Sequence, residues 1–267
     1  MPKGLKIAIG GKGGVGKTTV CAVWSHLFAE DGFNVMAIDA DPNVTLASAF
    51  GIPSQNSPRP LIEMKEIIAE RTGTTKDSPG LYFKMNPKVS DLPEQFWVDL
   101  GRIKLLVLGA ITQAGAGCAC AEGVFLKALL THTILQRQEV VLVDLAAGVE
   151  SMGRASIQGI DVLVIVVEPG ARSINTAKNI ANMAKQLGIE TIVAVANKIT
   201  DPLQTNIIKS ELDGITLLAA IPYDPAVQRA DINSESVFTT ATETTQQLRK
   251  AWQQLNKLIC SAGQVGH

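Results

Sequence analysis

The stretch GGKGGVGKTT, at positions 10–19, constrains the fold of this chain more than any other part of its sequence. The pattern G-x-x-x-x-G-K-T runs from Gly11 to Thr18, after the short apolar run Leu5–Ile9 and before a helix-like stretch. Glycines let backbone N–H groups close around phosphate oxygens, and the following helix points the positive end of its dipole at the same place. The sequence therefore predicts a strand, a phosphate-binding loop and a helix in immediate succession.

The loop also supplies charged and hydroxyl groups that suit a nucleoside triphosphate. Lys17 places a positive charge where the β- and γ-phosphates lie, and the Thr18 hydroxyl is suited to ligate Mg²⁺. We therefore expect the chain to bind MgATP. The expected nucleotide contacts in the loop are Gly11, Gly13, Gly14, Val15, Gly16, Lys17, Thr18 and Thr19.

Short apolar runs alternate with helix-like stretches along most of the chain. Most runs are continuously apolar, as in strands buried on both faces of a parallel sheet. This alternation predicts an α/β fold with a doubly wound, mostly parallel sheet of the P-loop NTPase kind, formed by one domain over residues 1–267. The predicted strands are Leu5–Ile9, Val35–Ile38, Leu105–Leu108, Val140–Val143, Val162–Val167, Thr191–Ala196 and Thr216–Ala219, and the predicted helices are Thr18–Asp31, Gly123–Gln136, Ser173–Leu187 and Thr242–Cys260.

The least regular segment is Gly51–Asp99, which is rich in Pro, Ser and Thr. It holds one helix-like piece, Leu61–Thr72. We expect an irregular elaboration of the sheet at about residues 51–100, rather than a second domain with its own core.

Composition narrows the classes of partner. Apolar residues make up 46% of the 267 residues, charged residues 18%, and the formal net charge is −1. A near-neutral chain has no general electrostatic attraction for nucleic acid or anionic lipid, so we expect neither as a partner. No apolar run approaches the roughly 20 residues of a membrane span, and 4 cysteines are too few for a disulfide scaffold. These features predict a cytoplasmic protein.

Polar residues follow three of the predicted strands. Asp39 and Asp41 lie in IDADP, and Asp144 ends VVLVD. Because carboxylates at the carboxyl ends of parallel strands can face a bound nucleotide, we expect Asp144 to lie near Mg²⁺, whereas Asp39 either lies near the metal or caps the next helix. Asn197 and Lys198 follow another apolar run, and the Asn amide can donate and accept at once, which suits an adenine edge.

Two of the cysteines, Cys118 and Cys120, lie one residue apart in GAGCAC. Gly115 and Gly117 make a bend easy, so that both thiolates can point the same way. A closed metal site usually takes four ligands, and a symmetric dimer would complete the set if this segment lay on its two-fold axis. Four thiolates suit Zn²⁺ as a tetrahedron or Ni²⁺ in a plane. The alternatives are a pair of small buried residues or a redox pair.

The sequence resembles known ATPases at two levels. The segment KGGVGKT, which begins at Lys12, is similar to the deviant phosphate loop of the MinD/ParA/nitrogenase iron protein class of dimerising ATPases. Further blocks resemble the CooC family, whose members help to insert nickel into carbon monoxide dehydrogenase, and its relative AcsF of acetyl-CoA synthase maturation. The blocks, which extend from Gly11 to Asp224, are GKGGVGKTT, IDADP, LIEMKEIIAERTG, NPKV, GAGCACAE, VLVDLAAGVE, VVEPGARSI, ANK and AIPYD.

The resemblance implies an ATP-dependent metallochaperone that works as a homodimer. In such a protein, Lys12 reaches the nucleotide of the partner subunit, Asp41 orients the attacking water, and Asp39 lies close to Mg²⁺. Asn197 reads the base edge of the nucleotide, and Lys198 beside it counts among the nucleotide-binding residues. The CxC cysteines of both subunits together hold one Ni²⁺ or Zn²⁺, and hydrolysis reopens the dimer so that the metal passes to the nickel enzyme.

Ala146 and Ser151 depart from the family pattern, in which an acidic residue or Gly, and often a His, stand at these places. The second switch and the hydrolysis rate are therefore expected to differ. The alternative function is a MinD-like regulatory or scaffold ATPase without a metal-delivery role. A nitrogenase-like cluster is not expected, because the other cysteines, Cys21 and Cys260, lie in helix-like stretches. The helix-like segment Thr245–Cys260 has few basic residues and is predicted to pack on the core rather than on a membrane.

Overall fold

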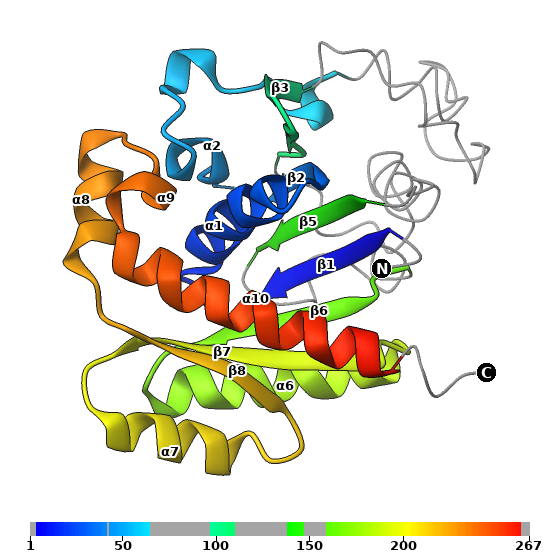
Figure 1. Cartoon of the computed structure of the whole chain (residues 1–267), viewed down its shortest axis with the longest axis vertical. Coiled ribbons are helices and arrows are strands. Elements are labelled where there is room, and N and C mark those ends of the chain that lie inside the picture. Colours follow the sequence, from blue (N-terminus) through cyan, green and yellow to red (C-terminus); the bar gives the residue numbers. More distant parts are fainter. Residues whose placement is uncertain (1–3, 42, 65–96, 110–137, 147–158, 263–267) are drawn as a thin grey trace.

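The computed structural model describes residues 4–41, 43–64, 97–109, 138–146 and 159–262. Within these residues, the centre of the molecule is one eight-stranded sheet with the order β3-β4-β2-β5-β1-β6-β7-β8 (Figure 1). Neighbouring strands are parallel except for β3 and β4. The strands are β1 (Leu5–Gly10), β2 (Asn34–Ala40), β3 (Trp97–Leu100), β4 (Ile103–Val107), β5 (Glu139–Leu145), β6 (Val162–Val167), β7 (Thr191–Ile199) and β8 (Thr216–Pro222).

Helices pack on both faces of the sheet (Figure 1). Each face has its own cluster of buried hydrophobic residues. The first face carries α1 (Lys17–Glu30), α2 (Leu46–Ala49), α8 (Pro225–Asn233), α9 (Val237–Thr240) and α10 (Thr242–Ala262). The second face carries α6 (Ala171–Gln186) and α7 (Pro202–Glu211).

The predicted doubly wound α/β fold is confirmed, and every predicted apolar run is a strand. The central strands β1 and β6 are buried at every residue, as continuous apolar runs require. Strand β1 pairs with β5 on one side and with β6 on the other. The chain thus winds in both directions from β1, and in such sheets ligands bind at the carboxyl ends of the strands beside this switch point. The glycine-rich loop leaves β1 at that place.

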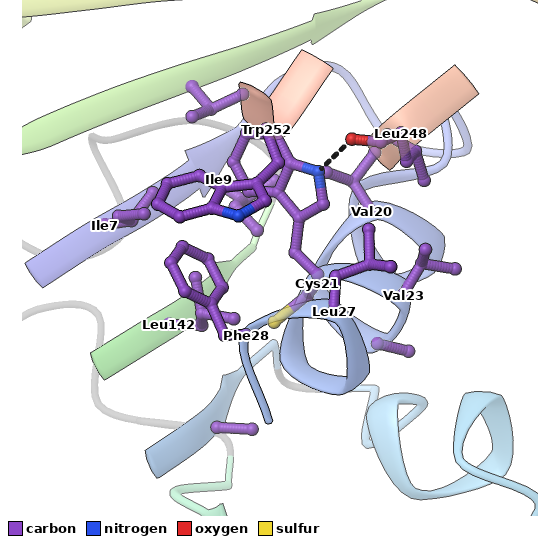
Figure 2. Close-up of a cluster of buried hydrophobic side chains, with 14 of the residues drawn as sticks. Ile7, Ile9, Val20, Cys21, Val23, Leu27, Phe28, Leu142, Leu248 and Trp252 are labelled. Atoms are coloured by element: carbon purple, nitrogen blue, oxygen red, sulfur yellow. Dashed lines mark hydrogen bonds between the residues drawn. The ribbon is translucent and has the colours of Figure 1, made fainter. Parts of the chain in front are cut away.

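Helix α1 packs both on the sheet and against α10, and Figure 2 shows side chains of both helices in one cluster with those of β1 and β5. Cys21 lies in α1, as predicted, and both Cys21 and Trp24 are completely buried. Nε1 of Trp24 donates to the carbonyl oxygen of Leu248 over 3.0 Å, and the rings of Phe28 and Trp252 are 4.1 Å apart. Burial on two sides holds the helix, and with it the end of the glycine-rich loop, in a fixed position.

The apolar side of α10 packs on the core, as predicted for this segment. Leu248 and Leu255 are completely buried, and Trp252 is 3% exposed. Nε1 of Trp252 also donates to Oδ2 of Asp31 over 2.8 Å, which ties α10 to the end of α1. No helix in the described ranges combines the length and the hydropathy needed to cross a membrane.

The structure adds elements that apolar runs did not indicate: β3, α2, α7, α8 and α9. Strand β3 is an edge strand that is only partly buried, so it lacks the continuous apolar pattern of the inner strands. It joins β4 through a tight turn, in which Gly101 has a φ of 80° and its N–H donates to Oδ1 of Asp99. Helices α7 and α8 begin with an Asp–Pro pair, a start signal that does not depend on apolar runs.

The prediction of a helix over Leu61–Thr72 is wrong at the start of that segment. Residues Leu61–Glu63 form a single 3₁₀ turn, and Met64 lies outside any helix. The remainder of this segment and the predicted helix Gly123–Gln136 lie outside the described residues.

Candidate functional site

The loop after β1 needs glycine where other groups approach its backbone. A Cβ added to Gly11 would lie 2.3 Å from the carbonyl oxygen of Val166, and one added to Gly16 would lie 2.3 Å from Nδ2 of Asn197. By contrast, a Cβ on Gly13 would meet no atom within 4 Å. The loop is therefore packed tightly on the side of β6 and β7 and has open space elsewhere, as a phosphate cradle requires.

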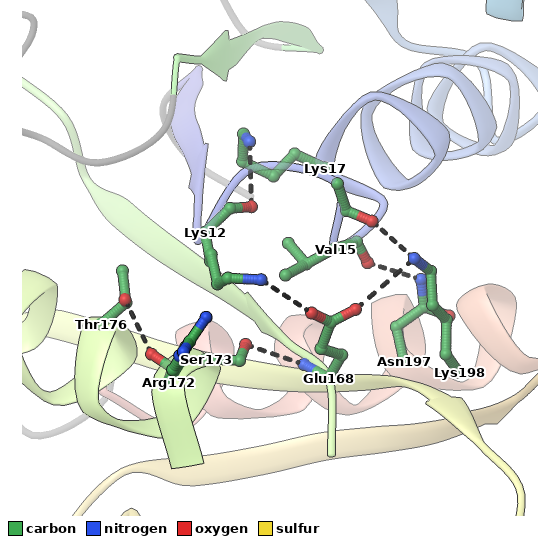
Figure 3. Close-up of polar contacts among 10 residues, drawn as sticks. Lys12, Val15, Lys17, Glu168, Arg172, Ser173, Thr176, Asn197 and Lys198 are labelled. Atoms are coloured by element: carbon green, nitrogen blue, oxygen red, sulfur yellow. Dashed lines mark hydrogen bonds and ion pairs between the residues drawn. The ribbon is translucent and has the colours of Figure 1, made fainter. Parts of the chain in front are cut away.

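The ammonium groups of two lysines and the side-chain amide of one asparagine donate to three carbonyl oxygens of the loop. The bonds are Lys17 Nζ to Lys12 O (3.3 Å), Lys198 Nζ to Gly14 O (2.6 Å) and Asn197 Nδ2 to Val15 O (2.8 Å), all drawn in Figure 3. In a trans peptide the C=O and the following N–H point in opposite directions. When these carbonyl oxygens bond to the side chains, the N–H groups that follow them in the chain point away from those side chains.

Helix α1 begins without a side-chain cap. The preceding residue, Gly16, has a φ of 102°, and the first turn contains no acidic residue. Helices α7 and α8, by contrast, begin with the capping side chains of Asp201 and Asp224. The start of α1 therefore offers its N–H groups and the positive end of its dipole to an anion.

Two carboxylates are fully buried at the carboxyl ends of β2 and β5. Asp39 and Asp144 are register partners in this strand pair. Burial raises the pKa of Asp144 to about 7, although the hydrogen bond from Thr18 opposes this effect. Burial also raises the pKa of Asp39 to about 6, against the hydrogen bonds that it accepts from backbone N–H groups. A cation beside these groups would favour their charged forms.

Asp144 and Thr18 present oxygens that fit Mg²⁺. Oγ1 of Thr18 donates to Oδ2 of Asp144 over 2.6 Å and lies 3.3 Å from Oγ1 of Thr45. Among the described atoms, Oδ1 of Asp144 is buried without a hydrogen-bond partner. Leaving a carboxylate oxygen unpaired is costly, and Mg²⁺ takes oxygen ligands from one or two carboxylates, water and substrate phosphates. This donor set therefore suits a magnesium-bound triphosphate.

Asp39 accepts hydrogen bonds from the turn that follows β2. Of the two roles that the sequence left open for Asp39, the structure shows the cap of the next helix. Its Oδ2 accepts from the N–H groups of Thr45 and Leu46, at 3.0 and 2.9 Å, and its Oδ1 accepts from that of Asp41 at 3.0 Å. These bonds cap the start of α2. The contact of Asp39 with Mg²⁺ stays a prediction. Asp41 is only partly buried, and its Oδ1 accepts from the N–H of Asn43.

Two adjoining cavities surround the loop. The first, which we name the phosphate lobe, has a volume of about 620 Å³ and extends to Asp41 and Ala146. The second, the base lobe, has a volume of about 490 Å³ and extends past Asn197 and Lys198 to the start of α8. The residues that line both lobes are Gly14, Gly16, Thr18 and Thr45.

The base lobe contains polar residues that the sequence did not single out as ligands: Tyr223, Asp224, Gln228 and Asp231. Asp224 accepts hydrogen bonds from the N–H of Ala226 and from Oγ1 of Thr244, each at 2.9 Å. Two features of the sequence could have pointed to these residues. The block AIPYD carried part of the family resemblance, and its polar pair, Tyr223 and Asp224, directly follows β8 and so lies at the same edge of the sheet as Asn197.

Lys12 does not line either lobe in the described part of the chain. Its Nζ lies 3.2 Å from Oε1 of Glu168, whose Oε2 lies 3.5 Å from Nζ of Lys198 (Figure 3). The side chain of Lys12 is 39% exposed. It is thus available at the surface beside the nucleotide site.

Cys118, Cys120 and Ser151 lie outside the described residues. In the part of the chain that is described, no group of three or more His, Cys, Asp and Glu residues could hold a metal ion. The Ni²⁺ or Zn²⁺ site therefore stays a prediction. Of the two described cysteines, Cys21 is buried and Cys260 is exposed.

Residues 6–237 match the family model of the CobQ/CobB/MinD/ParA nucleotide binding domain. The chain therefore belongs to this family of nucleotide-binding ATPases, in agreement with its loop, its sheet and its buried carboxylates.

Relatives within the family are more specific. The chain is 45% identical to the carbon monoxide dehydrogenase accessory protein CooC of Rhodospirillum rubrum over 229 residues, which are 85% of this chain and 87% of that protein. The predicted resemblance to CooC is thereby confirmed. An uncharacterized ATP-binding protein of Methanocaldococcus jannaschii is 44% identical over 85% of this chain and 88% of its own length.

The septum site-determining protein MinD of Pyrococcus horikoshii, solved as a complex with Mg-ADP, has a similar structure. The TM-score is 0.66 at 18% identity, and the likeness covers 96% of this chain and 97% of that one. At this identity the comparison supports the shared fold alone.

Proposed function

We propose that the chain, acting as one domain over residues 1–267, couples MgATP hydrolysis to the delivery of a metal ion. In the phosphate lobe, Lys17 and the loop amides would bind the phosphates, and Thr18 would ligate Mg²⁺ with Asp144 beside it. Asp41 would orient the attacking water. The magnesium site is supported most directly by the buried Oδ1 of Asp144, which has no hydrogen-bond partner among the described atoms and lies next to the Thr18 hydroxyl.

The base lobe would hold adenosine. Asn197 already lies against the loop, since it bonds to the carbonyl oxygen of Val15, and its amide oxygen can accept from an adenine amino group. Asp231 is exposed on α8 and lines the lobe, which suits a ribose hydroxyl. Lys198 would act indirectly, because its ammonium is bonded to the loop at Gly14.

We propose further that the working form is a homodimer in which Lys12 acts on the nucleotide of the partner subunit. Lys12 belongs to the loop, yet among the described residues it does not line the lobes of its own protomer, and its side chain is partly exposed. A cation brought from a second subunit would neutralise charge that develops on the phosphates during hydrolysis.

The metal is assigned to Cys118 and Cys120 of both subunits, as one shared Ni²⁺ or Zn²⁺ site. The support is the CxC pattern in the sequence and the 45% identity to CooC, which is named as an accessory protein of carbon monoxide dehydrogenase. We infer that the target is a nickel enzyme, either carbon monoxide dehydrogenase or acetyl-CoA synthase, and that the protein works in the cytoplasm.

Metal content and mass of the purified protein after exposure to Ni²⁺ test this function. We expect about one Ni²⁺ per dimer for the wild type and none for Cys118→Ala/Cys120→Ala. Cys260→Ala, which removes an exposed cysteine elsewhere, should bind as the wild type does. Equal and negligible metal in all three proteins would leave a MinD-like regulatory or scaffold ATPase.

A further inference from the structure

Glu168 lies between two lysines of the nucleotide site (Figure 3). Its Oε1 is 3.2 Å from Nζ of Lys12, and its Oε2 is 3.5 Å from Nζ of Lys198. The side chain of Glu168 is 24% exposed, whereas those of Lys12 and Lys198 are 39% and 41% exposed. One carboxylate thus connects the glycine-rich loop with the end of β7.

The carboxylate extends from a rigid support. Glu168 directly follows β6, and its N–H donates over 3.1 Å to Oγ of Ser173, which is buried in the first turn of α6. Strand β6 itself lies against the loop, since Gly11 closely approaches the carbonyl oxygen of Val166. Lys12, by contrast, reaches Glu168 with a long and flexible side chain. Glu168 therefore determines where the ammonium of Lys12 is held.

The contact with Glu168 competes with the proposed trans contact, because an ammonium held by its own protomer is not free to cross a dimer interface. We propose that Glu168 is a positioning residue, which retains Lys12 in the nucleotide-free protomer and releases it to the triphosphate bound by a second copy of this chain. This inference rests on the trans role proposed for Lys12.

The strength of the contact suits a reversible restraint. Ion pairs as exposed as this one shift an equilibrium by about two- to fivefold. A triphosphate carries several negative charges and would displace a single carboxylate. After Lys12 leaves, Lys198 remains beside Glu168 and also keeps its bond to the carbonyl oxygen of Gly14. Release therefore does not leave the carboxylate without a cation.

The first test measures the contact itself. Lys12 in the nucleotide-free monomer is acylated with an amine-reactive ester, and its rate of labelling is followed by peptide mass spectrometry. We expect about two- to fivefold faster labelling in Glu168→Gln than in the wild type. Glu211→Gln is the matched control, because Glu211 forms a comparable exposed pair with Lys178 in which Nζ and Oε2 are 2.6 Å apart. In that variant, labelling should rise at Lys178 and stay unchanged at Lys12.

The second test measures the consequence. Dimerisation is titrated with Mg²⁺ and a non-hydrolysable ATP analogue, by sedimentation or light scattering. Glu168→Gln should dimerise at about two- to fivefold lower analogue concentration, Glu211→Gln should match the wild type, and Lys12→Gln should dimerise poorly.

The outcomes separate a failure of the role proposed for Glu168 from a failure of the trans role proposed for Lys12. Unchanged labelling of Lys12 in Glu168→Gln would overturn the restraint. Faster labelling with an unchanged or higher dimerisation threshold, while Lys12→Gln is impaired, would show that the contact does not govern release. If Lys12→Gln dimerised and hydrolysed ATP normally, the trans role of the proposed function would fail, and the restraint would have no purpose in dimerisation.

Discussion

The phosphate lobe and the base lobe prepare for a nucleotide in different ways. The phosphate lobe uses groups already buried and held, among them Lys17, which is 6% exposed, and the completely buried Asp144 behind it. The base lobe is formed by the ends of β7 and β8 with α8, and Tyr223 on its wall is 50% exposed. The groups proposed to meet the phosphates are thus buried and held, whereas those proposed to meet the base lie closer to water. Substitutions should therefore affect turnover or the binding of Mg²⁺ in the first lobe, and affinity for the nucleoside in the second.

The largest effect is expected for Asp41→Ala, in the phosphate lobe. Loss of the carboxylate proposed to orient water should lower the rate of ATP hydrolysis by about 10²–10⁴-fold and leave MgATP affinity nearly unchanged. Phosphate release and equilibrium binding of a fluorescent ATP analogue measure the two quantities. Asp213→Ala, an exposed aspartate between α7 and β8, serves as control. Turnover at the normal rate in Asp41→Ala would remove Asp41 from its assigned role.

Asp144→Asn tests how the buried charge behaves. The pKa of Asp144 is raised to about 7 in the folded protein, so the unfolded chain releases its proton at lower pH than the folded protein does. The free energy of unfolding of the nucleotide-free protein should therefore fall as the pH rises from about 4 to 7, by on the order of 4 kcal/mol from this group.

Asp144→Asn should remove that pH dependence, and should stabilise the nucleotide-free protein at pH 8 more than at pH 5. Urea unfolding at the two pH values measures the difference. The same variant should lose Mg²⁺-dependent ATP binding. An equal change in stability at both pH values would contradict a raised pKa at this position.

Asn197→Ala tests the boundary between the two lobes. The variant loses the hydrogen bond to Val15 O and the proposed contact with adenine, so the affinity for MgATP should fall by about tenfold. Turnover at saturating ATP should change little. Competition binding of ATP against GTP should show a smaller preference for ATP than in the wild type. An unchanged preference would move base recognition to other residues of the base lobe.

The smallest effect is expected for Asp224→Ala, in the base lobe. The loss of the α8 cap and of the bond from Thr244 should lower the free energy of unfolding by about 1–2 kcal/mol. The affinity for ATP should fall by less than in Asn197→Ala. Asp201→Ala is a matched control, because Asp201 caps α7 through the N–H of Leu203 and does not line either lobe. It should lose similar stability and keep its affinity for ATP.

The loop residues that line the phosphate lobe could be listed from the sequence because their information is local. The glycines, Lys17 and Thr18 are consecutive in the chain, and Asp144 ends an apolar run whose place in the sheet follows from its pattern. The doubly wound sheet was predictable for the same reason, since its inner strands are continuously apolar. Edge strand β3 was not, because exposure removes that pattern.

The base lobe could not be assembled from the sequence to the same extent. Asn197 and Asp231 come from different segments, and only the strand order brings β7, β8 and α8 to the loop. Glu168 was missed because a glutamate after a strand has many possible partners, and its two lysines are 156 and 30 residues away in the chain. The capping role of Asp39 depends on a turn geometry that the spacing of IDADP leaves open.

The uncapped start of α1 also limits how this protein can be stabilised. Placing Ser or Asp ahead of a helix is a common way to raise stability, but at Gly16 such a side chain would meet Asn197 and bring its own oxygen to the helix amides. It would thus imitate the phosphate and compete with it. Thermostability selected at this position would come at the expense of nucleotide affinity, and the helix is best regarded as one whose cap is its ligand.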